Sequence, residues 1–194
     1  MFRKPLKPSM PRFFMISALA AASIAAMAVL SACYPAFNWR EVRPQGTALS
    51  ILLPCKPDKA QKTVSLGGKP TGLTLLGCDA GDITFAIAVA ELGNVLDAAP
   101  VLAQWQEASL GNMKAEPVGE GAGASNAVSL KILGASTRPP AVLVRARGQR
   151  ADGRPVSGQA AYFAQGSQVF QAVVYADKIP QEVAETFFSS LKFE

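Results

Sequence analysis

The pattern of apolar and polar residues predicts two runs of strands, each followed by a helix. The first run has four strands joined by short turns, which together predict an antiparallel meander over residues 47–53, 62–66, 72–78 and 83–91. In the fourth strand, large apolar residues alternate with Thr84, Ala86, Ala88 and Ala90. Because alternate residues point to opposite faces of a strand, one face of this strand is small enough to lie under a helix.

The second half of the pattern repeats this order. A helix starting near Asp97 and ending at Gly111 is followed by strands over residues 127–134, 141–149, 159–165 and 168–175. The last helix begins near Pro180 and has apolar residues at four-residue steps: Ile179, Val183, Phe187 and Leu191. This order predicts one α+β domain over residues 47–194, an antiparallel sheet sandwich with helices packed on its faces.

The first 33 residues have the composition of an export signal. Four basic residues and no acid occupy residues 1–12, an apolar run follows, and Leu30-Ser31-Ala32-Cys33 closes the segment. These four residues resemble the lipobox of a bacterial lipoprotein signal. The resemblance implies acylation of the Cys33 thiol, cleavage before Cys33 and acylation of the new amino terminus. It divides the chain into a signal peptide (1–32), a lipidated tether (33–46) and the domain (47–194).

The resemblance also predicts where the protein resides. A lipoprotein domain of this kind is held at the bacterial cell envelope and faces the periplasm, and the absence of Asp after Cys33, where Tyr34 stands, favours the outer over the inner membrane. Two alternatives stay open. Residues 13–32 are long enough to span a bilayer as an uncleaved anchor in the inner membrane, and Cys33 is also compatible with an ordinary cleavage site.

The charge of the chain changes once the signal is removed. The full sequence has 19 basic and 14 acidic residues, a net charge of +5, but residues 1–32 contain four of the basic residues and no acid. The remainder has 15 against 14, a net charge of +1. The basic balance therefore gives no argument for nucleic acid as a partner.

Cys55 and Cys78 are the remaining two cysteines, and an exported compartment favours a disulfide between them. We expect both to fall at the ends of strands that flank the same neighbouring strand. Two buried free thiols are the alternative. A redox-active pair is disfavoured, because there is no Cys-x-x-Cys motif and no histidine to lower a thiol pKa.

A basic cluster stands out in the second half. Arg145 and Arg147 alternate with apolar neighbours in one predicted strand, so both guanidinium groups lie on one face. Arginine suits carboxylate and phosphate groups, so we expect an anion- or partner-binding stripe for anionic lipid or an acidic envelope protein, formed with Arg150, Arg154 and the nearby Arg138. The alternative is a solvated strand face balanced by acids elsewhere.

No catalytic, metal or cofactor motif is complete. The chain has no histidine, which removes the commonest general base and metal ligand. The glycines of 119–123 do not match a phosphate-binding loop, and Asp79 with Asp82 lacks the other ligands of a calcium loop. The one Ser-x-x-Lys, from Ser189 to Lys192, stands without the Ser-Asp-Asn and Lys-Thr-Gly motifs that accompany it in serine β-lactamases. We therefore expect no catalytic residue, cofactor or metal.

The domain also resembles a known group. Leu53-Pro54 ends the first strand, Asp152-Gly153 forms a hairpin, Gly-Ser-Gln-Val-Phe-Gln-Ala covers 166–172, and Phe-Phe-Ser-Ser-Leu-Lys-Phe covers 187–193. In these features the chain is similar to the PsbP-like α/β/α sandwich group. The resemblance implies a mostly non-enzymatic binding or assembly accessory of membrane complexes. It assigns no binding residue, because the shared positions are core and turn residues.

Three functional hypotheses follow. The preferred one is a lipid-anchored, non-catalytic binding or accessory domain that engages an envelope partner. The second is a divergent hydrolase that uses carboxylates from distant positions, such as Asp79 or Asp152. The third is the same periplasmic domain on an uncleaved single-pass anchor in the inner membrane.

Overall fold

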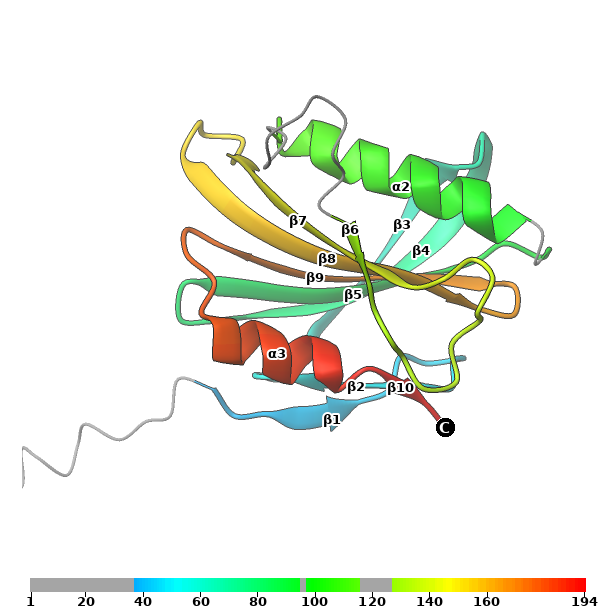
Figure 1. Ribbon diagram of the computed structural model, residues 1–194, viewed down its shortest axis with the longest axis horizontal. Helices are drawn as coiled ribbons and strands as arrows, with labels where there is room; N and C mark the ends of the chain where they lie inside the picture. Colours follow the sequence, from blue (N-terminus) through cyan, green and yellow to red (C-terminus); the bar gives the residue numbers. More distant parts are fainter. Residues whose placement is uncertain (1–36, 95–96, 116–126) are drawn as a thin grey trace, which may run out of the picture. The chain divides into compact units, whose positions relative to one another are not determined.

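The computed structural model describes residues 37–94, 97–115 and 127–194. These residues form two antiparallel sheets and two helices, α2 (Ala98–Asn112) and α3 (Gln181–Ser189) (Figure 1). The small sheet has the order β1-β2-β10, with β1 Arg40–Val42, β2 Leu49–Leu53 and β10 Lys192–Phe193. The large sheet has the order β3-β4-β5-β9-β8-β7-β6. Its strands are β3 Asp58–Leu66, β4 Lys69–Ala80, β5 Ile83–Glu91, β6 Ala127–Ser129, β7 Val142–Gln149, β8 Pro155–Gln165 and β9 Gln168–Ala176.

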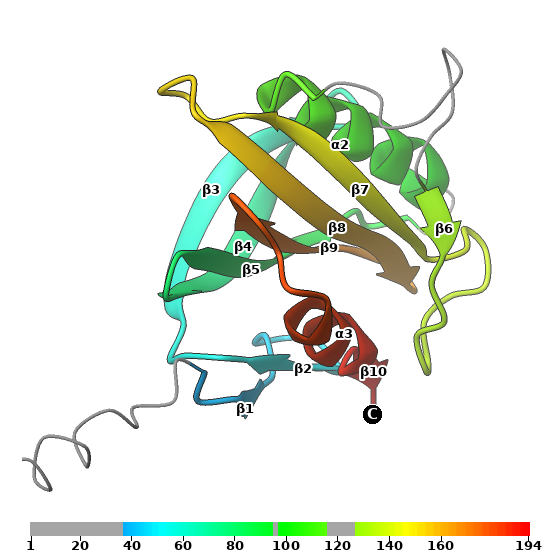
Figure 2. The same ribbon diagram turned by 60° about the vertical axis from the view of Figure 1, so that its left-hand side comes forward.

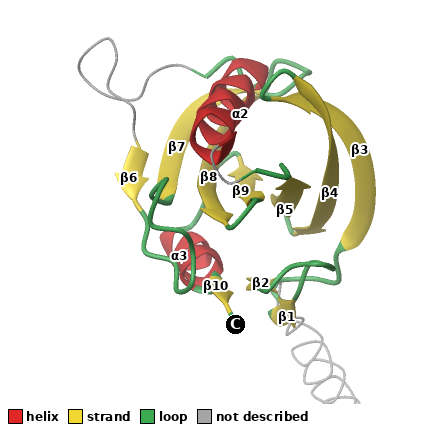
Figure 3. Ribbon diagram, turned by 90° about the vertical axis from the view of Figure 1, so that its right-hand side faces the viewer, coloured by secondary structure: helices red, strands yellow, loops and turns green. Residues whose placement is uncertain are grey.

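The large sheet is covered on both faces. The helix α2 lies on the side toward which the sheet curves, and α3 and the small sheet cover the other side (Figures 2 and 3). Large apolar residues of the central strands, such as Phe85, Phe163 and Phe170, belong to the core shared with α3 and β2. Their neighbours along the strands belong to a second core under α2.

The predicted α+β class, with an antiparallel sheet and helices on its faces, is confirmed. The small face of β5 also lies where the pattern places it. Ala88 and Ala90 share a core with Val101, Leu102 and Trp105 of α2. Small side chains on the sheet let the helix approach closely.

The first predicted meander is wrong in one strand. Of its four strands, only β3, β4 and β5 lie side by side in the large sheet, whereas β2 is the central strand of the small sheet. The strand β2 pairs with β1 on one edge and with β10, at the end of the chain, on the other. Both of its edges are therefore occupied by segments that are very short in sequence.

The fold also begins earlier than residue 47. Residues 40–42, predicted as part of the tether, form β1 and pair with β2. Before them, the ring of Phe37 stacks on Trp39, and both rings meet Phe85 of the large sheet edge-on. The backbone amide of Asn38 donates to the carbonyl of Pro54 at 2.8 Å. The segment 37–46 is thus part of the packed domain.

The strand predicted over residues 127–134 is shorter than expected. Only Ala127–Ser129 pair with β7, and Leu133 then forms a parallel bridge with Lys192. The chain passes close to the carboxyl-terminal strand at Gly134, where φ is +77° and a Cβ atom would lie 2.8 Å from the Cβ atom of Phe193. This close approach takes the chain away from the edge of the large sheet.

Cys55 and Cys78 form a disulfide, with their Cα atoms 6.0 Å apart. The pairing is the predicted one, but the strand arrangement behind that prediction is wrong. Cys55 follows β2 of the small sheet, whereas Cys78 lies in β4 of the large sheet. The disulfide therefore crosslinks the two layers rather than two strands around a common neighbour.

This crosslink leads to a stability prediction. Replacing both cysteines by alanine should lower the free energy of unfolding by about 3 kcal/mol, because the unfolded chain regains the freedom of the closed loop. Urea denaturation followed by circular dichroism measures the change. A reducing agent should shift the parent protein to the midpoint of the double variant and leave the variant unchanged. An equal midpoint for oxidised parent and variant would contradict a stabilising role.

Candidate functional site

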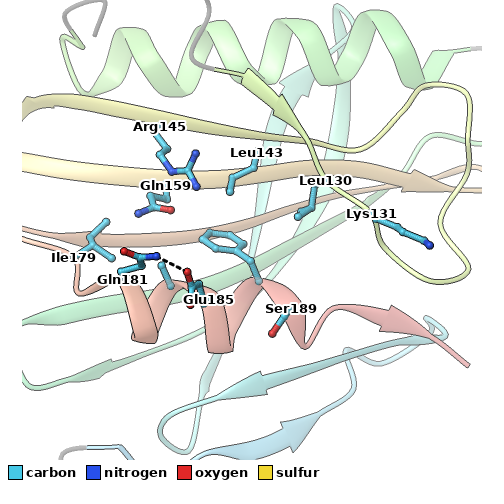
Figure 4. A pocket seen from close by; sticks show the side chains of 11 residues that line it. Leu130, Lys131, Leu143, Arg145, Gln159, Ile179, Gln181, Glu185 and Ser189 are labelled. Carbon is cyan, nitrogen blue, oxygen red and sulfur yellow. Dashed lines mark hydrogen bonds between the residues drawn. The ribbon is translucent and has the colours of Figure 1, made fainter. Parts of the chain in front are cut away.

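A groove of about 630 Å³ lies between α3 and the strands β7 and β8, on the α3 side of the large sheet (Figure 4). It draws on four separate segments: the chain after β6, the strands β7 and β8, the connection before α3, and α3 itself. Its lining residues are Leu130, Lys131, Leu143, Arg145, Gln159, Ile179, Gln181, Ala184, Glu185, Phe188 and Ser189.

The floor of the groove is apolar. Leu143 of β7 is buried in the core shared with α3, and Ala184 and Phe188 are buried on the inner face of that helix. Leu130 and Ile179 are partly buried against the same core. The floor is therefore an extension of the hydrophobic core to the surface, and a ligand that covers it would bury apolar area.

The rim of the groove is polar and carries charges of both signs. Arg145 and Gln159 are paired neighbours on β7 and β8 and form one wall. On the opposite wall, the side-chain amide of Gln181 donates to the carboxylate of Glu185 at 2.6 Å. Within residues 37–94, 97–115 and 127–194, neither Arg145 nor Glu185 forms an ion pair. Both charges are thus accessible to a partner.

The structure separates the predicted arginine cluster into different environments. Arg145 lines the groove, and Arg147 is exposed two residues further along the same strand. Arg150 pairs with Asp177 at 3.2 Å, and Arg154 pairs with Asp152 at 2.8 Å. Asp177 lies outside residues 138–154, the segment of the predicted arginine cluster. Arg138 lies in the connection between β6 and β7. The five guanidinium groups do not form one uninterrupted stripe.

The ion pair at the β7–β8 hairpin shifts the pKa of both partners. The backbone amide of Arg154, and then its side chain, donate to Asp152 and lower the pKa of that carboxyl group. The same contact raises the pKa of Arg154. Asp152 is therefore an ionised turn residue near neutral pH.

The two carboxylates proposed for a hydrolase do not converge. Asp79 lies in β4, whereas Asp152 lies in the hairpin that joins β7 to β8. In the sheet, β5 and β9 separate β4 from β8, which makes at least three strand spacings, or about 14 Å. Asp79 instead accepts a hydrogen bond from the Thr84 hydroxyl at 2.6 Å, within its own hairpin.

The face under α2 contains a buried polar network that the sequence pattern does not reveal. The side-chain amide of Gln171 donates to the Ser109 hydroxyl at 2.8 Å and to the Tyr162 hydroxyl at 3.0 Å. Burial raises the pKa of Tyr162, and burial with repulsion from Tyr162 raises the pKa of Tyr175 to about 12. The network ties α2 to β8 and β9, and its polar groups satisfy one another.

Several groove residues were not singled out from the sequence. Gln159, Gln181 and Glu185 are ordinary polar residues on a strand and a helix, and only their position opposite one another distinguishes them. The spacing of Gln181 and Glu185, four residues apart on one helix, indicates a contact between them, but it does not indicate which strand they face. Arg145 is the groove residue that the sequence pattern had marked.

Other sequence features are outside the described residues or lack further support. Cys33 and the glycine-rich stretch 119–123 lie outside the described ranges. In the part of the chain that the structure describes, no helix is long and apolar enough to cross a membrane. In that same part, no three or more His, Cys, Asp or Glu side chains gather in a way that could hold a metal ion.

No family model matches this chain, and no curated protein matches its sequence. A search of solved structures finds a protein from Bacteroides thetaiotaomicron VPI-5482 that is similar to it, with 12% sequence identity and a TM-score of 0.47. The match covers 80% of this chain and 48% of that one, so this chain spans about half the length of that structure.

Proposed function

We propose that this chain is a lipid-anchored protein of the bacterial cell envelope whose periplasmic domain binds a partner and does not catalyse a reaction. The groove between α3 and the β7–β8 strands is the observation that carries the binding role. It combines an apolar floor with an accessible arginine on its rim. Protein–protein interfaces have the same layout, with an apolar centre and a polar rim.

The anchor rests on the sequence Leu30-Ser31-Ala32-Cys33 after a basic and then an apolar segment. Two or three acyl chains on Cys33 would hold the domain firmly, since a single chain gives only marginal membrane binding. The Cys55–Cys78 disulfide supports an oxidising compartment. We further propose the outer membrane, because Tyr34 rather than Asp follows the cysteine.

A segment of an envelope protein is the partner that suits the groove best. Arg145 and Lys131 would attract an acidic group, and an apolar side chain would cover Leu143 and Phe188. Glu185 on the opposite wall would repel the phosphate of an anionic lipid but could accept a hydrogen bond from a peptide amide or a basic side chain. The PsbP-like resemblance supports the same role, an accessory to a membrane complex.

The anchor is tested by the mass of the mature amino terminus. Protein isolated from bacterial membranes should lack residues 1–32 and carry acyl chains on Cys33, and Cys33→Ser should remain an uncleaved, unacylated precursor. Mass spectrometry of the intact protein distinguishes these species. An intact Met1 on the parent protein would instead support the uncleaved single-pass anchor, and a free thiol at Cys33 would support ordinary cleavage.

The groove is tested by site-specific photocrosslinking in intact cells. A photoreactive phenylalanine derivative at Gln181 should give an adduct of one defined mass, and the same residue at Glu107, exposed on α2, should not. Arg145→Glu should weaken that adduct at least about tenfold, since a lost charged hydrogen bond costs on the order of 1.5–3 kcal/mol. Arg138→Glu is the matched control, because it makes the same charge change away from the groove.

Two results would contradict a protein partner at this groove. The first is the same adduct from Gln181 and Glu107, which would indicate non-specific collision. The second is an adduct that Arg145→Glu and Arg138→Glu weaken equally.

A further inference from the structure

Phe37, four residues after Cys33 in the sequence, is already part of the packed domain. Phe37 is held by its ring contacts with Trp39 and Phe85, whose ring centroids lie 5.9 and 6.4 Å from its own. The next residue, Asn38, donates its amide to Pro54 at 2.8 Å, and β1 then pairs with β2. Only Tyr34, Pro35 and Ala36 stand between Cys33 and Phe37 in the sequence.

Chain geometry limits how far this connection can reach. Four steps along the chain separate Cys33 from Phe37, and a fully extended chain spans at most about 3.3–3.6 Å per residue. Phe37 therefore lies within about 14 Å of the Cys33 backbone. A domain joined to its acyl anchor by so short a linker cannot rotate freely above a membrane.

We propose that one particular end of the domain rests on the headgroup layer of the bilayer: the end formed by Phe37, the turn at residues 54–56 and the β4–β5 hairpin. This inference rests on the proposed acylation of Cys33 and adds to it the orientation of the domain. Figures 1 and 2 both show the start of β1 and the β4–β5 hairpin at the same end. The Cys55–Cys78 disulfide fixes the turn at 54–56 to the base of that hairpin.

The charges at this end indicate how it is held. The charged residues on the two turns, directly beside them and next to Phe37 are two bases, Arg40 and Lys56, and three acids, Asp58, Asp79 and Asp82. Anionic headgroups do not attract a surface with this balance. The acyl chains and the short linker therefore hold the domain in place, and added salt should not release it.

The helix α2 lies on the opposite face of the large sheet from β1 and β2 (Figures 1 and 3). The two tryptophans of the chain mark these two faces. Trp39 contacts Phe85 in the core beside the small sheet, whereas Trp105 is buried in the core under α2. In the proposed orientation, Trp39 is close to the bilayer and Trp105 is further from it.

Energy transfer to the membrane surface tests this orientation. Full-length protein with its native anchor is placed in phosphatidylcholine vesicles that contain a dansyl-labelled lipid, in the variants Trp105→Phe and Trp39→Phe. The first retains Trp39 and should transfer more efficiently to dansyl than the second, which retains Trp105. High salt should leave the difference unchanged.

A second variant tests the effect of linker length without changing a core residue. Insertion of a Gly-Ser segment of about ten residues after Ala36, in the Trp105→Phe background, adds roughly 17 Å of root-mean-square reach. Transfer from Trp39 should then fall, because the domain moves and reorients away from the surface. The near-ultraviolet circular dichroism of each variant confirms that its aromatic core is intact.

The outcomes separate the orientation from the anchor. Unmodified Cys33 in the isolated protein would overturn the proposed anchor and the orientation with it. Acylated Cys33 together with equal transfer from Trp39 and Trp105, or with no effect of the inserted segment, would overturn the orientation alone.

Discussion

The seven-stranded sheet is apolar on both faces, so each face needs a cover that excludes water. The helix α2 covers one face over small residues such as Ala88 and Ala90. The other face presents large residues such as Phe85 and Phe170, and α3 alone does not cover it: the small sheet completes the layer. The amino-terminal segment is therefore drawn into the core, and the Cys55–Cys78 disulfide joins the two layers covalently.

The sequence predicts the parts of this structure that depend on local periodicity. Alternation in residues 83–91 identifies a strand with a helix on its small face, and the four-residue steps from Ile179 to Leu191 identify α3 and its buried side. The small sheet cannot be predicted in this way. The strands β1 and β10 have three and two residues, too few for a period to show, and β10 comes from the other end of the chain.

In the candidate groove, too, local alternation predicts one residue and tertiary packing decides the others. The exposed position of Arg145 on its strand could be read from the alternation with Val144 and Ala146. Its neighbours could not, because Leu130, Gln159 and Glu185 come from three separate segments that only the packing of α3 brings together. The paired state of Arg150 likewise depends on Asp177, which is 27 residues away in sequence. Where function depends on non-local contacts, residue type and spacing give the candidates but not their grouping.

The linker between Cys33 and the fold is short only because residues 37–42 are part of the fold. Hydrogen exchange of the full chain tests this most directly. The amide of Asn38, bonded to the carbonyl of Pro54, should exchange slowly, on the timescale of amides in the neighbouring strand β2. Exchange of Asn38 as fast as in an unstructured peptide would show that residues 37–42 are a tether. The domain would then be free to turn above the membrane, contrary to this account.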